Sequence, residues 1–273
     1  MEFIAHKFSG LGNEILIIDF LSQNGEIHEE DVIKISKKNN ISFDQLITIL
    51  PPTNPITDLK VDIFNRDGSI AENCVNGARC LAKYVKDNGL LTKKFFLVET
   101  SGSEWKISSR KKKEYSVELS SVNISNDNNS FSTKKNKVKL KLEEEIIDLN
   151  LISLGNPHAV VFLKNIKEAP LDSWGKSLQK NTLFPNGINL GIAKIISPKE
   201  VNLRVYERGV GETESCGSGA CAAVISGYNE KVLQNRVKVN FKKGSININY
   251  DKDLNVLEAS GGAEFINKLR LKA

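Results

Sequence analysis

The residues from Glu207 to Cys221 read ERGVGETESCGSGAC. Cys216 opens a run of small residues, and an apolar pattern with a helical period begins at Ala220. This pattern predicts a loop that places Cys216 at or just before the first turn of a helix. The free backbone N–H groups and the dipole of a helix N-terminus stabilise a thiolate and bind anions. Cys216 is therefore a candidate reactive thiol.

The same arrangement occurs 142 residues earlier, where Asn73 to Cys80 reads NCVNGARC. Pairs with this spacing are Asn65 with Glu207, Cys74 with Cys216, Gly77 with Gly219, Ala78 with Ala220, Gly102 with Gly244 and Ser103 with Ser245. With a spacing of 143, Leu11-Gly12-Asn13 aligns with Leu154-Gly155-Asn156. The sequence therefore predicts two similar halves, each of which presents one cysteine at a helix start.

Two such thiols fit a reaction that inverts a carbon centre. One group removes a proton from one face of the carbon, and another delivers a proton to the opposite face. The alternative for any single cysteine is a small buried hydrophobic residue. We expect that alternative for Cys80 and Cys221, which fall inside the helical patterns. The matching glycine-rich and polar contexts of Cys74 and Cys216 favour a catalytic role for those two.

These motifs resemble the signatures of diaminopimelate epimerases. The first is carried by FNRDGS from Phe64 and CVNGARC from Cys74, and the second by ERGVGET from Glu207 and CGSGAC from Cys216. The shorter stretches GLGN from Gly10, FDQL from Phe43 and GNPH from Gly155 are similar in the same order.

The resemblance implies an isomerase that interconverts LL-2,6-diaminoheptanedioate and its meso form, in lysine and peptidoglycan precursor synthesis. It also implies that no cofactor is used, pyridoxal phosphate included, so fixed dipoles in a closed site must stabilise the carbanionic transition state. The implied fold is α+β, with two pseudo-symmetric halves that each curl a mostly antiparallel sheet around a central helix. We expect residues 1–119, completed by 263–273, to form the half with Cys74. We expect residues 120–262 to form the half with Cys216.

The family pattern also implies the site residues. Cys74 and Cys216 exchange the roles of thiolate and thiol, Glu207 meets the ammonium at the reacting end, and His158 lies beside a thiol. The backbone N–H groups after each cysteine bind the α-carboxylate, and other side chains hold the remaining substrate groups. The expected binding residues are Asn13, Gln45, Asn65, Val75, Asn76, Asn156, Asn189, Arg208, Gly217 and Ser218.

Several of these residues have simpler interpretations. Each asparagine could close a turn, and Arg208 could form a surface ion pair. Two other functions also stay open. One is a related two-cysteine racemase or epimerase for another amino acid, and the other is a non-catalytic amino-acid-binding homologue. Arg208 and its asparagines favour a substrate with a second carboxylate, and the two matched cysteines argue against a loss of catalysis.

Composition and sequence pattern argue against several other classes of protein. The 273 residues carry a net charge of +5 and 40% hydrophobic residues, which is ordinary for a globular protein. The basic residues are scattered, so we expect no nucleic-acid partner. We expect no membrane partner, no metal site, free thiols and a cytoplasmic location, because the chain shows no apolar run of spanning length and no paired Cys-x-x-Cys motif.

Several positions depart from the family pattern, and two of them, Val75 and Asn267, bear on the site and on the oligomeric state. Val75 stands where the family has glycine, but we expect a helical φ there, which valine tolerates. Asn267 falls where the family has an aromatic residue linked to dimer formation, so the sequence leaves a homodimer open.

Overall fold

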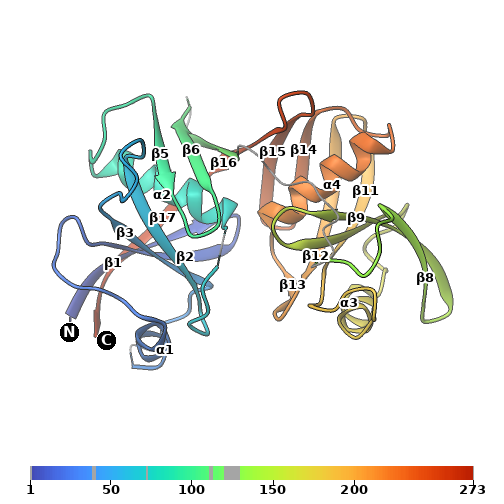
Figure 1. The fold of residues 1–273 in the computed structure, drawn as a ribbon, viewed down its shortest axis with the longest axis horizontal. Coiled ribbons are helices and arrows are strands. Elements are labelled where there is room, and N and C mark those ends of the chain that lie inside the picture. The colour runs from blue at the N-terminus through green and yellow to red at the C-terminus, as the bar shows by residue number, and fades with distance from the viewer. Residues whose placement is uncertain (1, 39–40, 72, 111–112, 120–129, 273) are drawn as a thin grey trace. The chain divides into compact units, whose positions relative to one another are not determined.

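The computed structural model describes the chain except for residues 1, 39–40, 72, 111–112, 120–129 and 273. The chain divides into two compact units. Unit 1 consists of Met1–Ser120 and Ser260–Ala273, and unit 2 consists of Ser121–Ala259. The boundaries expected from the sequence were 119/120 and 262/263. Both units are drawn in Figure 1.

Unit 1 surrounds one long helix with strands. Its elements are β1 (Glu2–Gly10), β2 (Asn13–Asp19), α1 (Glu29–Lys38), β3 (Gln45–Leu50), β4 (Leu59–Asn65), α2 (Val75–Asp87), β5 (Phe95–Glu99), β6 (Glu104–Ser109), β7 (Glu114–Leu119) and β17 (Glu264–Lys272). The pairs β2–β3 and β4–β5 are parallel, and β1–β17, β1–β2, β3–β4, β5–β6 and β6–β7 are antiparallel.

Unit 2 is built on the same plan. Its elements are β8 (Lys137–Leu142), β9 (Glu145–Ser153), β10 (Pro157–Phe162), α3 (Leu171–Gln179), β11 (Asn189–Ser197), β12 (Glu200–Glu207), β13 (Gly211–Thr213), α4 (Gly217–Asn229), β14 (Arg236–Phe241) and β15 (Gly244–Asp251). A further strand, β16 (Val256–Gly262), crosses the boundary between the two units. The pairs β10–β11 and β12–β14 are parallel, and β8–β9, β9–β10, β11–β12, β12–β13 and β14–β15 are antiparallel.

The spacing found in the sequence recurs in these elements. Helix α4 begins and ends 142 residues after α2, and β9 begins and ends 143 residues after β1. The two parallel pairs of unit 1 also have parallel counterparts in unit 2. One strand differs in origin, because β1 pairs with the C-terminal β17, whereas β9 pairs with β8, which precedes it. The predicted α+β fold with two pseudo-symmetric halves is confirmed.

Strands surround each central helix and bury most of its surface. Helix α2 packs on β1, β2, β6, β7 and β17, and α4 packs on β9, β10, β11, β12 and β15. Helix α4 is rich in alanine and glycine, so strands can approach it from several sides, and residues from Ala220 to Ile225 have no exposed surface. The burial of each helix fixes the position of the cysteine that precedes it.

Strands β7 and β8 flank the segment between the two units, and the sequences of both alternate apolar with polar residues. Between these strands, Ser130 and Phe131 are buried in unit 2. Residues 120–129 lie outside the described part of the chain.

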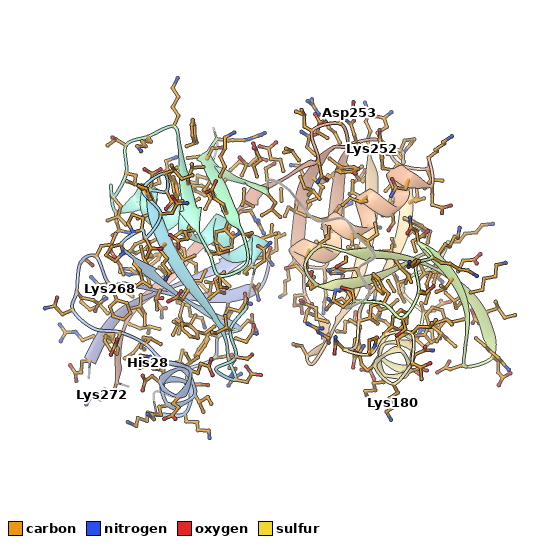
Figure 2. All side chains as sticks on the ribbon, viewed as in Figure 1. His28, Lys180, Lys252, Asp253, Lys268 and Lys272 are labelled. Atoms are coloured by element: carbon orange, nitrogen blue, oxygen red, sulfur yellow. The ribbon has the colours of Figure 1, made fainter. Side chains whose placement is uncertain are left out.

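Charged side chains lie mostly at the surface of each unit. Figure 2 labels Lys180 just after α3 and Lys252 in the turn after β15, both of them exposed. Lys268 and Lys272 of β17 are also exposed. Within the described residues, no helix is long and apolar enough to cross a membrane.

Candidate active site

Cys74 caps the N-terminus of α2. Its backbone is extended, with φ −148° and ψ 96°, and its Sγ accepts a hydrogen bond from the N–H of Gly77 at 3.1 Å. A side chain at Gly77 would be crowded, because a Cβ there would lie 3.1 Å from the Cys74 sulfur and 2.7 Å from Ile47. Glycine at this position therefore lets the thiol reach the backbone donor of the first turn.

Asn13 is the polar side chain beside Cys74. Its Oδ1 lies 4.0 Å from the Cys74 Sγ, and its Nδ2 donates to Asp44 at 3.1 Å. Asp44 also accepts from the backbone N–H of Glu14 at 2.7 Å, so the turn after β1 is tied to the start of β3. This arrangement holds the Asn13 carbonyl oxygen toward the thiol.

Gln45 and Asn65 lie opposite each other on β3 and β4. The Nε2 of Gln45 donates to the Asn65 Oδ1 at 3.0 Å, and the Asn65 Nδ2 donates to Ser69 at 3.1 Å. The structure thus brings these two predicted residues together in unit 1. The bonds between Asn65 and Ser69 close the turn after β4, so the simpler interpretation of Asn65 also holds.

Val75 is the first residue of α2, and Asn76 follows it. The φ of Val75 is not positive, and its side chain is buried. Valine therefore occupies the position without backbone strain, as expected from the sequence. Asn76 is buried, and its Oδ1 accepts from the Nη2 of Arg79.

Cys216 caps α4 in the same way. Its φ is −135° and its ψ is 114°, and its Sγ accepts from the N–H of Gly219 at 3.4 Å. Burial raises the pKa of the Cys216 thiol well above its usual value, and the negative charge of Glu207 raises that pKa further. The Oε1 of Glu207 accepts from the Thr213 hydroxyl at 2.5 Å. Glu207 is thus the charged neighbour of this thiol.

His158 reaches Cys216 through two intermediate residues. Its Nε2 lies 3.0 Å from the Asn156 Oδ1, and the Asn156 Nδ2 lies 3.5 Å from the Ser218 hydroxyl. That hydroxyl lies 3.5 Å from the Cys216 sulfur. Burial lowers the pKa of His158 to about 3, and the charge of Arg208 lowers it as well. A neutral His158 can orient Asn156 but carries no charge to the thiol near neutral pH.

Arg208 is placed by Asn189. The Asn189 Oδ1 accepts from the backbone N–H of Arg208 at 2.9 Å, and its Nδ2 donates to the Pro157 carbonyl at 2.9 Å. The guanidinium is exposed, and its Nη1 donates to the Asn186 carbonyl at 3.0 Å. Among the described residues, no carboxylate forms an ion pair with Arg208. Its charge is thus not neutralised by the surface ion pair considered from the sequence.

Cys80 and Cys221 are fully buried inside the helices. Burial raises the pKa of each thiol to about 12. Neither sulfur ionises near neutral pH, which fits the core role expected from the sequence.

The structure groups the predicted residues by unit. In unit 1, Asn13, Val75 and Asn76 lie around Cys74, and the Gln45–Asn65 pair joins the start of β3 to the end of β4. Around Cys216 lie Gly217, Ser218, Glu207, Asn156 and His158, with Asn189 and Arg208 linked to each other.

Sequence reasoning missed four residues that position these groups: Asp44, Arg79 and Thr213 through their side chains, and Asn186 through its backbone carbonyl. Asp44, Arg79 and Thr213 belong to motifs already quoted, and that adjacency was the available signal. No group of three or more His, Cys, Asp or Glu that could hold a metal ion occurs in the described part of the chain.

Comparison with known proteins identifies the family. The family model described as diaminopimelate epimerase matches residues 5–124 and 150–266. A diaminopimelate epimerase of Pseudomonas aeruginosa is 35% identical over 247 residues, covering 89% of this chain and 90% of that protein. A diaminopimelate epimerase of Pseudomonas paraeruginosa is 34% identical over 247 residues, which again cover 89% of this chain and 90% of that protein.

The chain belongs to the diaminopimelate epimerase family. The family match spans both cysteine-bearing helices, and the relatives are named as epimerases, which are isomerases. The family expected from the sequence is therefore confirmed.

Solved structures share the fold of this diaminopimelate epimerase family member at low identity. A PhzF-family phenazine biosynthesis protein of Enterococcus faecalis has a TM-score of 0.70 at 11% identity, with 100% of both chains covered. A hydroxyproline epimerase of Agrobacterium vitis has a TM-score of 0.66 at 9% identity, covering 99% of this chain and 92% of that one. These similarities concern the fold alone.

Proposed function

We propose that this protein is an epimerase that interconverts LL-2,6-diaminoheptanedioate and meso-diaminoheptanedioate. The observation that carries the proposal is the matched pair of helix-capping thiols, Cys74 and Cys216, in a chain of the diaminopimelate epimerase family. Each sulfur already accepts a backbone N–H of a helix start, which is a site that favours negative charge.

The chemistry requires one thiolate and one thiol. The thiolate removes the α-proton, and the thiol protonates the opposite face of the carbanion, so the two sulfurs end the turnover with exchanged protonation states. The α-carboxylate binds backbone N–H groups at the two helix starts, at Val75 and Asn76 and at Gly217 and Ser218. These fixed dipoles stabilise the developing charge, so no cofactor is needed as an electron sink.

The remaining residues recognise the two ends of the substrate. Arg208 binds the distal carboxylate, because its guanidinium is exposed and has no carboxylate partner in the described structure. Asn65, Asn156 and Asn189 hold the distal amino-carboxylate group. Glu207 receives the ammonium at the reacting end, with Asn13 and Gln45 nearby, and His158 acts through Asn156 and Ser218 on Cys216.

The proposal extends to pathway and location. Diaminopimelate epimerisation belongs to lysine and peptidoglycan precursor synthesis, and we infer a cytoplasmic enzyme that acts on a small molecule without nucleic-acid or membrane partners. Asn267 lies exposed on β17 at the position of the family's aromatic residue, so a homodimer would form without that aromatic contact.

One experiment tests both the proton transfer and the identity of the substrate. Purified protein is incubated with LL-diaminopimelate in D₂O, and NMR and chiral chromatography record loss of the α-hydrogen and formation of the meso form. We expect both changes, and we expect neither with Cys74→Ala. Exchange with another amino acid but not with diaminopimelate would support the related racemase. Binding of diaminopimelate without exchange would support the non-catalytic homologue.

A further inference from the structure

Helix α3 ends at a glutamine whose side chain bonds to the main chain. The Nε2 of Gln179 donates to the Gly175 carbonyl at 3.0 Å and to the Ile188 carbonyl at 2.8 Å. Its Oε1 accepts from the backbone N–H of Ile188 at 3.1 Å. The amide of Gln179 therefore pairs with Ile188 as an opposite residue on a neighbouring strand would. These bonds join the end of α3 to the segment that leads into β11.

The segment held by Gln179 carries the carbonyl that binds Arg208. The Nη1 of Arg208 donates to the Asn186 carbonyl at 3.0 Å. Gly187, the next residue, has a φ of +73°, which favours glycine. A Cβ at Gly187 would lie 2.5 Å from the Gln179 Oε1 and 3.1 Å from the Cδ of Arg208. Gly187 therefore lies against both the amide of Gln179 and the aliphatic part of Arg208.

The contact between α3 and Arg208 is supported by a packed core. Helix α3 packs on β11 and β12 (Figure 1), and Leu178, Ile188 and Tyr206 belong to one cluster of buried residues. A Cβ at Gly175 would lie 2.3 Å from the Tyr206 ring, so glycine lets α3 approach β12 closely. Tyr206 comes two residues before Arg208. Helix α3 thus supports both the strand that carries Arg208 and the loop that binds its guanidinium.

The bond to Asn186 leaves one edge of the guanidinium available. In the part of the chain that the structure describes, the Nε and Nη2 of Arg208 have no hydrogen-bond partner. An arginine binds a carboxylate through two parallel N–H donors, and Nε and Nη2 form such a pair. Binding also costs the rotamer freedom of a long side chain. Holding Nη1 in advance therefore reduces the entropy that is lost when a carboxylate binds the other edge.

From these contacts we infer that Gln179 is a positioning residue for Arg208. It fixes the loop 186–188, whose Asn186 carbonyl holds the guanidinium with its Nε–Nη2 edge open to the distal carboxylate of the substrate. Gln179 acts through this loop and does not contact the substrate itself. The identity of the carboxylate rests on the proposed function. A residue that only stabilised the fold would change the unfolding temperature and leave both KM and the motion of Arg208 unchanged.

The kinetic experiment compares two substitutions on α3 in the full-length protein. Gln179→Met keeps a similar length and removes the bonds to Gly175 and Ile188. Ser177→Met, the matched control, places the same side chain on the exposed face of the helix. We expect the KM for LL-diaminopimelate to rise about fivefold in Gln179→Met and to stay at the wild-type value in Ser177→Met. The change in kcat should be smaller than the change in KM, because the proton-transfer groups are unaltered.

A double-mutant cycle tests whether Gln179 acts through Arg208. In an Arg208→Lys background, Gln179→Met should cause no further rise in KM, because the guanidinium that it positions is already absent. Independent effects of about fivefold and about tenfold would instead multiply to about fiftyfold. Gly187→Ala disturbs the same contact from the loop and should also raise KM. Thermal unfolding shows whether each variant is folded, and Gly187→Ala replaces Gln179→Met in the cycle if the latter does not fold.

A second measurement needs no substrate. NMR relaxation of the isotope-labelled, unliganded protein gives the order parameter of the Arg208 Nε–H bond, whose signal is assigned by its loss in Arg208→Lys. We expect an ordered bond in the wild type and in Ser177→Met. In Gln179→Met the order parameter should fall below about 0.6, the range of flexible groups.

Any one of the following results would overturn the inference. They are an unchanged KM in the folded loop or helix variant, fully multiplicative effects in the cycle, and an Arg208 order parameter that is equal in the wild type and in that variant. If diaminopimelate is not epimerised but the order parameter falls as expected, the proposed function fails and the positioning of Arg208 by Gln179 stands. Epimerisation with unchanged motion of Arg208 gives the reverse conclusion.

Discussion

The side-chain oxygen of Asn189 accepts the backbone N–H of Arg208 at 2.9 Å. Because Asn189 also donates to the Pro157 carbonyl, it joins the start of β10, the start of β11 and the end of β12 at one point. The backbone of Arg208 is therefore held in place by Asn189, although the Arg208 side chain is exposed. This favours a role in binding over a freely moving surface charge.

Arg208→Lys should weaken binding of diaminopimelate. Lysine keeps the charge but loses the bidentate geometry toward a carboxylate, so we expect KM to rise about tenfold, which corresponds to about 1.4 kcal/mol. The matched control is Arg204→Lys on β12, which keeps the charge but loses the two-point contact of Arg204 with Glu212 of β13, in which both hydrogen bonds are 2.8 Å long. Its KM should stay close to wild type. Equal kinetics for Arg208→Lys and wild type would show that Arg208 does not bind the distal carboxylate.

The four cysteines should divide into two classes. Cys74→Ala and Cys216→Ala should each reduce epimerisation by several orders of magnitude, because each removes one of the two proton-transfer groups. Cys80→Ala and Cys221→Ala are the controls from the next turn of each helix. They should retain activity and lose about 1 kcal/mol of unfolding free energy, since both sulfurs are fully buried. Turnover near wild type in Cys74→Ala or Cys216→Ala would eliminate the two-base mechanism.

Val75→Gly should lower stability without changing the fold. Val75 begins α2 without positive φ and is 4% exposed, so glycine adds backbone entropy to the unfolded state and removes buried apolar surface. We expect a loss of about 2 kcal/mol in denaturant unfolding. Turnover of diaminopimelate should stay within about tenfold, since the backbone N–H is retained. A gain in both stability and turnover would instead indicate strain at this position.

His158 should make the fold sensitive to acid. Its pKa is about 3 in the folded protein, below the ordinary value of 6.5, so the unfolded chain binds the extra proton between these values. Stability should therefore fall as pH drops below 6.5, by about 2 kcal/mol between pH 7 and pH 5 from this residue. His158→Gln should show a smaller loss over that interval in urea unfolding.

His28→Gln is the control for this titration. The His28 side chain is 67% exposed and lies before α1, so its replacement removes a histidine without altering a buried site. Its stability profile with pH should match wild type. If His158→Gln loses as much stability as wild type between pH 7 and pH 5, the acid sensitivity has another origin.

The sequence by itself determined the repeat, the two thiols and the family. A constant spacing of 142 residues is visible without coordinates, because both halves use the same turn and cap residues at the same places. The small residues after Cys74 and Cys216 predict helix starts from local conformational preference, and α2 and α4 begin at the next residue. Cys80 and Cys221 were placed in the core by helical periodicity alone, and both are buried.

Only the tertiary structure decided what surrounds each thiol. Strand β17 pairs with β1, although nearly the whole chain separates them, and no local pattern specifies that pairing. Arg79 reads as an ordinary polar residue of a helix in the sequence, yet α2 is enclosed by strands on several sides and the guanidinium has no exposed surface. The same burial raises the pKa of Cys216 beside Glu207. Burial and the distance between charges depend on how distant segments pack, which is why the chain order alone does not give them.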